Sequence, residues 1–169
     1  YMGQGVPRVA AACLICEVDG TEAGVDTQIE HTKSVFAFGG ATEIQVSTTE
    51  QERQRFWSGR KNAFPAVGRI SPDYYCIDGT IPRQQLGRVL AGIAELSSTY
   101  GLRVANVFHA GDGNLHPLIL YDGAQPGEFE RTEALGGKIL ELCIEVGGTI
   151  TGEHGVGLEK IDQMCIQFQ

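Results

Sequence analysis

The sequence has no long apolar run and no excess of basic residues. None of its hydrophobic stretches approaches the roughly 20 residues that a helix needs to span a bilayer, so we expect no transmembrane segment. The formal net charge at pH 7 is −8. Because a uniformly acidic chain is repelled by phosphate backbones, nucleic-acid binding is disfavoured. The first residues also lack the basic region and apolar stretch of a signal peptide, although an internal start of a longer chain would look the same. We expect a cytoplasmic protein.

Cysteine is sparse and unevenly spaced. An odd set of five argues against a disulfide framework and for a reducing compartment. Cys13 and Cys16 have the spacing of a redox motif, but they fall in an apolar run that is typical of a strand. A redox motif of this kind needs a helix N-terminus to lower the thiol pKa. We therefore expect both to be buried structural cysteines.

The length and the pattern of apolar residues predict one domain over residues 1–169. Strand-like and helix-like segments alternate, and some strands follow each other through short turns. This order predicts the α+β class, with a ferredoxin-like antiparallel sheet and helices packed on one face. The predicted strands are 9–18, 41–47, 74–81, 103–108, 115–121 and a short segment at 149–151; the predicted helices are 21–36, 48–65, 86–96 and 126–146, with a last helical turn near 158.

Two glycine-rich segments carry three of the four histidines. They read HAGDGNLH over residues 109–116 and GEHGVG over residues 152–157. A hairpin of this length can bring His109 and His116 to the same side, and neutral imidazole is the commonest metal ligand. Glu153 could complete the three protein ligands of a catalytic metal site. On spacing alone, the alternative remains that this segment is an ordinary turn, in which Asp and Asn stabilise the turn and no metal is bound.

Two further residues are candidates for work on a substrate. His154 follows Glu153 directly, so it points elsewhere if the glutamate holds a metal, and an imidazole pKa near 6.5 suits a general base. The alternative is an ordinary exposed loop histidine. Arg60 lies on a predicted helix, and an arginine fork is a natural clamp for a substrate carboxylate. Taken alone, this arginine is more often a solvated surface charge.

Four segments together resemble the C-terminal domain of FAD-linked oxidases. Residues 106–117 (NVFHAGDGNLHP) and 148–157 (GTITGEHGVG) carry the resemblance to this family of 2-hydroxy acid dehydrogenases. Residues 56–65 and 74–82 look closest, within the family, to the flavoprotein subunit of glycolate oxidases. The resemblance covers nearly the whole chain.

The resemblance implies a role for each candidate residue. Positions matching His109, His116 and Glu153 hold a divalent metal, often zinc, and the position matching His154 acts as the base. The arginine matching Arg60 grips the carboxylate of a small 2-hydroxy acid of the glycolate or D-lactate type, whose hydride passes to FAD. We also assign Asn114 to substrate binding.

The resemblance further implies that the chain is a fragment. The N-terminal FAD-binding domain of the parent chain and the family's extreme C-terminal segment are missing, so we assign no FAD-binding residue and expect the fragment alone to be inactive. Other oxidase subunits are expected partners and could hold the enzyme at the periphery of the inner membrane. Two alternatives remain: a metal-dependent hydrolase that uses the same ligands on a bound water, and a non-catalytic ferredoxin-like interaction module.

Overall fold

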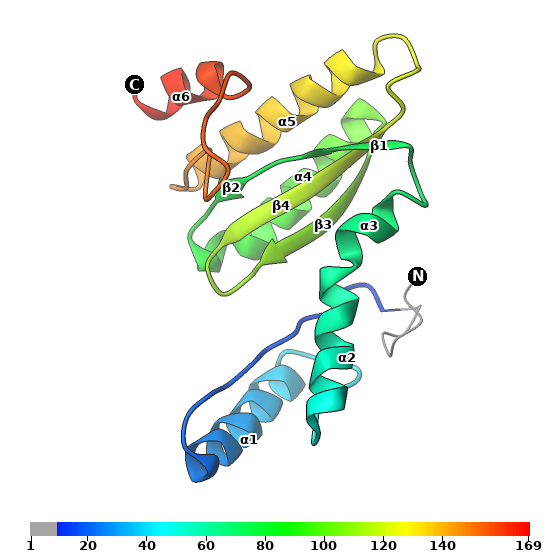
Figure 1. Ribbon diagram of the computed structural model, residues 1–169. Coiled ribbons are helices and arrows are strands. Elements are labelled where there is room, and N and C mark those ends of the chain that lie inside the picture. The colour runs from blue at the N-terminus through cyan, green and yellow to red at the C-terminus, as the bar shows by residue number, and fades with distance from the viewer. Residues whose placement is uncertain (1–9) are drawn as a thin grey trace. The chain divides into compact units, whose positions relative to one another are not determined.

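A computed structural model describes residues 10–169 of the chain (Figure 1). The chain divides into two compact units, Tyr1–Asn62 and Ala63–Gln169. No helix in the described part is both long and apolar enough to cross a membrane.

The described part of the first unit contains two helices, α1 (Glu22–Phe38) and α2 (Glu50–Lys61), close to the predicted bounds. Each begins at a threonine whose hydroxyl accepts a backbone hydrogen bond, from Gly24 N–H to Thr21 and from Glu52 N–H to Thr49. Such caps satisfy donors that the first turn of a helix leaves free.

The strands predicted at 9–18 and 41–47 do not form among the described residues; Val9 lies outside them. A strand needs a partner for its backbone groups, and the described part of the first unit contains none. Cys13 and Cys16 are both exposed, so the prediction of buried cysteines is wrong. Glu17 instead ties this segment to α2, where it accepts hydrogen bonds from Arg53 and Trp57.

The second unit is built on an antiparallel sheet with β4 (Asn114–Tyr121) at its centre. β3 (Arg103–His109) pairs along one side of β4, and β1 (Asp73–Cys76) and β2 (Gly79–Thr80) follow one another along the other. A single bridge joins Thr149 to Thr80 beyond β2. The strand–strand–helix–strand–strand–helix order from β1 to α5 and this sheet confirm the predicted α+β class.

The strand predicted at 74–81 is interrupted between β1 and β2. Cys76 pairs with Leu118 and Gly79 with Leu115, so one continuous register places Ile77 opposite Pro117. Ile77 donates to the Pro117 carbonyl, but proline has no N–H to return the bond. The same register places Asp78 opposite His116.

The helices α4 (Leu86–Tyr100) and α5 (Glu128–Glu145) cover one face of the sheet, as Figure 1 shows. Their apolar stripes pack with Leu115 and Ile119 into the main core. Gly101 ends α4 in the left-handed conformation, as predicted for a C-terminal glycine.

The opposite face of the sheet carries a smaller cluster. There the short helix α3 (Ala63–Val67) places Val67 against Leu118 and Leu120. The remaining helical segments are a 3-10 turn, Arg83–Gln85, before α4 and α6 (Ile161–Gln167) near the end of the chain.

Candidate active site

The predicted histidine hairpin is the turn between β3 and β4. His109 pairs with Asn114 across it, and Val107 pairs with His116. Side chains alternate between the faces of a strand, so Asn114 and His116 share the face of Leu118, away from α4 and α5. The site therefore lies on the face that the two long helices leave free.

Gly113 makes this turn possible. Its φ is +74°, a conformation that side chains disfavour, and a Cβ there would lie 2.2 Å from the carbonyl oxygen of Ile81. Ile81 in turn donates its N–H to the Gly113 carbonyl. The turn is thus fitted against the chain that follows β2.

The three predicted metal ligands meet at one carboxylate oxygen. Oε1 of Glu153 lies 2.8 Å from Nε2 of His116 and 4.0 Å from Nε2 of His109. Asn114 Nδ2 donates to the same oxygen at 3.3 Å. His116 is only 3% exposed, whereas His109 and Glu153 are about half exposed, at 50% and 54% of their side chains. A small ion can reach this point from solvent.

This donor set fits a divalent metal. Two atoms bound to one zinc ion at about 2.0–2.1 Å lie roughly 3–3.5 Å apart in tetrahedral geometry, close to the His116–Glu153 separation. His109 stands farther away, with its Nε2 4.0 Å from the same oxygen, and would have to move closer to join them. Two imidazoles and a carboxylate are typical ligands of zinc and similar ions.

Asp78 is the functional residue that the sequence reasoning missed. Its carboxylate is completely buried beneath the second histidine segment and accepts hydrogen bonds from the backbone N–H groups of Gly152, Glu153 and His154. The Thr151 hydroxyl donates to it as well. This buried anion fixes the loop that presents Glu153 and His154.

The loop's hydrogen bonds keep the buried Asp78 ionised. Burial alone would raise its pKa, but the donors from His154, Thr151 and the neighbouring backbone outweigh it, and the net pKa lies well below its usual range. Nζ of the buried Lys160 lies 3.6 Å from the carboxylate and donates to the Asp78 carbonyl. Although Asp78 belongs to a cluster with His116, Glu153 and His154 whose ligand atoms lie within 4.8 Å, its oxygens are already used by the loop.

Gly152 allows the loop to reach the hairpin. A Cβ at this position would lie 2.5 Å from Oδ1 of Asn114. Asn114 is nearly buried and uses its amide nitrogen to hold Glu153, while its Oδ1 has no partner among the described residues. The structure thus gives Asn114 a part in positioning Glu153; its predicted contact with substrate stays a prediction.

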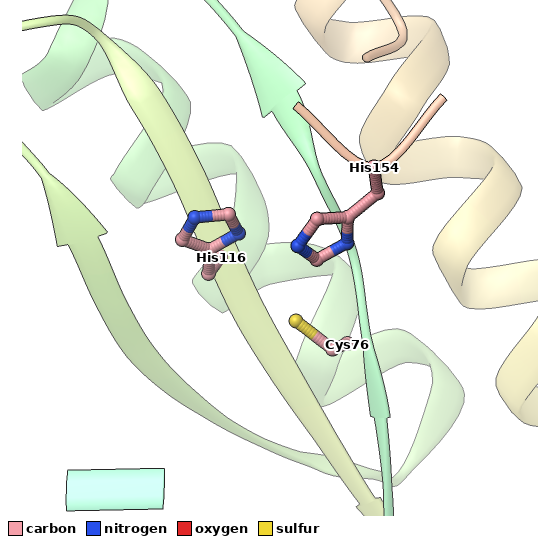
Figure 2. Close-up of side chains that lie close together, drawn as sticks. All are labelled: Cys76, His116 and His154. Atoms are coloured by element: carbon pink, nitrogen blue, oxygen red, sulfur yellow. The ribbon is translucent and has the colours of Figure 1, made fainter. Parts of the chain in front are cut away.

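A ring nitrogen of His154 also lies within 4.8 Å of ligand atoms of His116 and Glu153. Its exposed ring stacks on that of His116, with centroids 5.1 Å apart and planes 16° apart. A base needs this combination of solvent access and a fixed ring. Figure 2 shows the two rings facing one another with the Cys76 sulfur beside them.

Cys76 is a second residue that the sequence reasoning left without a role at this site. Its Sγ lies within 4.8 Å of a nitrogen of both His116 and His154. Burial and the nearby Asp78 charge raise the pKa of its thiol to about 11. The sequence holds one signal for this role. Cys76 and Asp78 stand two positions apart on a predicted strand, so their side chains face the same side, and the partner strand carries His116 on that side.

Arg60 belongs to the last turn of α2 in the first unit, and its role as a substrate ligand stays a prediction. His109, Asn114, His116, Glu153 and His154 all come together in the second unit.

The chain is similar in sequence to several known proteins. The chain is 63% identical over 168 residues to the glycolate oxidase subunit GlcD of Escherichia coli K12, covering 99% of this chain and 34% of that protein. It is 36% identical over 160 residues to GlcD of Bacillus subtilis, covering 95% and 34%. A D-lactate dehydrogenase of Anaerostipes hadrus is 29% identical over 156 residues, covering 91% and 33%.

The chain thus spans about a third of the length of the curated relatives it matches. Residues 1–169 match one family throughout, described as FAD linked oxidases, C-terminal domain. With the histidine hairpin, the Glu-His loop and the α+β sheet in place, the chain belongs to the C-terminal domain family of FAD-linked oxidases.

Proposed function

We propose that this chain supplies the metal-binding, proton-accepting and substrate-binding residues of a flavin-dependent 2-hydroxy acid dehydrogenase. The observation that carries the proposal is the convergence of His109, His116 and Asn114 on one oxygen of Glu153, with His154 beside them. The names of the relatives favour glycolate or D-lactate as substrate.

We propose His109, His116 and Glu153 as the ligands of a divalent metal, with zinc as the first candidate. When bound, such an ion would polarise the 2-hydroxyl group of the substrate. Asp78 and Asn114 hold Glu153 toward the histidines, so the ligands are arranged before the ion arrives.

His154 is proposed to accept the hydroxyl proton of the substrate. The buried carboxylate of Asp78 fixes the backbone of His154 through its N–H, and the ring of His116 limits where the imidazole can swing. Arg60 is proposed to hold the substrate carboxylate through its guanidinium fork. FAD, bound by another part of the parent protein, would take the hydride.

Other oxidase subunits are proposed as partners, because two relatives are named as subunits. An association of the enzyme with the inner membrane through such partners belongs to the same proposal.

A dye-reduction assay of the full-length protein with FAD tests this function. Wild type should oxidise glycolate or D-lactate, and His154→Gln should lower turnover by about 10²- to 10⁴-fold, as expected for loss of a general base. His31→Gln is a matched control, because His31 is an exposed histidine on α1 with no proposed role in the site. A wild-type protein that oxidises no 2-hydroxy acid but hydrolyses an ester or amide would favour the hydrolase instead.

A further inference from the structure

A second set of side chains with possible metal-ligand atoms lies next to the proposed ligands. Sγ of Cys76 and one ring nitrogen each of His116 and His154 lie within 4.8 Å of one another (Figure 2). Cys76 comes from β1, His116 from β4, and His154 from the loop before α6. This set contains no carboxylate, so its chemistry differs from that of the His109–His116–Glu153 set.

His116 can serve either set, one at a time, because its two nitrogens face different neighbours and a neutral imidazole has one nitrogen lone pair to offer. With an ion at Nδ1, the ring proton stays on Nε2, which donates to Glu153. Nε2 lies beside Glu153, whereas Nδ1 is buried and has no hydrogen-bond partner in the described part of the chain. A buried polar atom without a partner loses its hydration and gains no interaction in return. With His116 only 3% exposed, an ion beside Nδ1 would supply the missing interaction.

The donor set selects a class of ion. One thiolate and two imidazoles suit zinc, cadmium and similar thiophilic ions, while magnesium and manganese prefer oxygen ligands. Three protein ligands leave one position of a tetrahedral ion for water.

We propose that Cys76 Sγ, His116 Nδ1 and a ring nitrogen of His154 bind a thiophilic divalent cation at a second position, separate from the Glu153 site. The Cys76 thiol releases its proton to solvent as the ion binds, so the sulfur coordinates as thiolate. Its position on β1, directly across from Leu118, keeps the sulfur on the same face as His116.

Occupation of this position would block the proposed base. A ring nitrogen of His154 that is bound to an ion cannot accept a proton, so excess zinc or cadmium would inhibit the enzyme. This consequence rests on the proposed function, but the presence of the site does not. The test therefore measures binding at Cys76 and uses no activity assay.

Site-resolved alkylation of the full-length protein is the first measurement. Each cysteine is labelled with iodoacetamide and quantified by mass spectrometry at increasing Cd²⁺, with Mn²⁺ as the hard-ion comparison. Cys165 is exposed and outside the cluster, which makes it the internal control. Cd²⁺ should protect Cys76 and leave Cys165 reactive, and Mn²⁺ should protect neither.

The His154→Gln variant tests the geometry. Loss of one of three ligands should raise the Cd²⁺ concentration that half-protects Cys76 by at least about 10-fold. Identical protection curves for Cys76 and Cys165, or a curve that His154→Gln does not move, would overturn the proposal.

Absorbance provides a second measurement in case Cys76 alkylates too slowly to follow. Titration with Cd²⁺ should give an ultraviolet cadmium–thiolate band that Cys76→Ser reduces by one thiolate equivalent, while Cys165→Ser leaves the Cys76 contribution intact. Cys13 and Cys16 are replaced by Ser in every variant, because these exposed thiols could bind cadmium themselves. An unchanged band in Cys76→Ser would contradict the second position.

Discussion

At the scale of single residues, Asp78 organises the active site without touching the proposed metal. Its buried carboxylate gathers three consecutive backbone N–H groups of the loop and the hydroxyl of Thr151. Successive N–H groups that converge on one anion form a preorganised binding cradle. The orientation of Glu153 and His154 therefore depends on one charge beneath them.

Replacing Asp78 by Asn should disturb both stability and metal binding. The amide has no negative charge for the loop's donors, and we expect a loss of about 2–4 kcal/mol in the free energy of unfolding. Metal affinity should fall by about 10–100-fold, the usual effect of losing a residue that orients a ligand. Denaturant unfolding and calorimetric metal titration measure the two effects.

Asp162→Asn is the matched control, because Asp162 is an exposed carboxylate in the first turn of α6. Equal stability and metal affinity in the two variants would show that Asp78 does not organise the loop.

The sequence predicted the residues that meet in the site better than the residues that hold them. His109, His116, Glu153 and His154 stand in glycine-rich motifs, which are visible without a structure. Asp78 stands in a mainly apolar segment, and its partners are backbone groups more than 70 positions later in the chain. Only the fold brings those groups to it, so no local pattern could assign its role.

At the scale of elements, the β3–β4 hairpin sets the spacing of the two histidines. Glycine is required at position 113 for two reasons: its φ is positive, and its Cα lies too close to the Ile81 carbonyl to leave room for a side chain. Gly111 lies in the same turn with open space around its Cα. The two glycines therefore offer a comparison within one turn.

Gly113→Ala should destabilise the hairpin, whereas Gly111→Ala should be nearly neutral. A side chain in the left-handed region costs about 1–2 kcal/mol, and the clash with Ile81 adds to this, so we expect a loss of at least about 2 kcal/mol. Thermal unfolding of both variants is the measurement. Similar melting temperatures for the two would contradict the requirement for glycine at position 113.

A hydrogen bond from Tyr75 on β1 to Glu159 holds the segment that leads into α6. Burial, together with Glu159, raises the pKa of Tyr75 above its ordinary value. The neutral phenol is favoured in the folded state, so its stabilising contribution is complete below the unfolded pKa of about 10. It is lost as the pH rises above that value.

Tyr75→Phe should therefore lower the free energy of unfolding at neutral pH. In alkaline solution, the difference in this free energy between the variant and wild type should become smaller. Denaturant unfolding of both proteins at pH 8 and at about pH 11 gives the comparison. A stability difference that stays constant with pH would argue against the raised pKa.

Elements were predictable where the periodic pattern and the tertiary partners agree. The helices α4 and α5 and the strands β3 and β4 form close to their expected positions. The helix α1 also forms there, although none of its residues is buried. The apolar segment at 10–18 remains without strand structure, because a strand is defined by its neighbour and not by its own composition. The break at Asp78 follows from Pro117 on the partner strand, which the pattern of 74–81 cannot reveal.

At the scale of the whole molecule, the site occupies the sheet face that α4 and α5 leave free. The core therefore supports the site from behind, while His109, Glu153 and His154 remain exposed to solvent. A site that is exposed on one side suits a domain that acts together with a cofactor bound by another part of the protein. This agrees with the membership of the chain in the FAD-linked oxidase family.

Anaerobic reduction of the flavin in the full-length protein tests this account most directly. Mixing wild type with excess glycolate or D-lactate should bleach the flavin absorbance, while Glu153→Gln and His154→Gln should slow the bleaching by about 100-fold or more at unchanged FAD content. Bleaching at the wild-type rate in both variants would contradict the assignment of the two loops as the metal-and-base half of the active site.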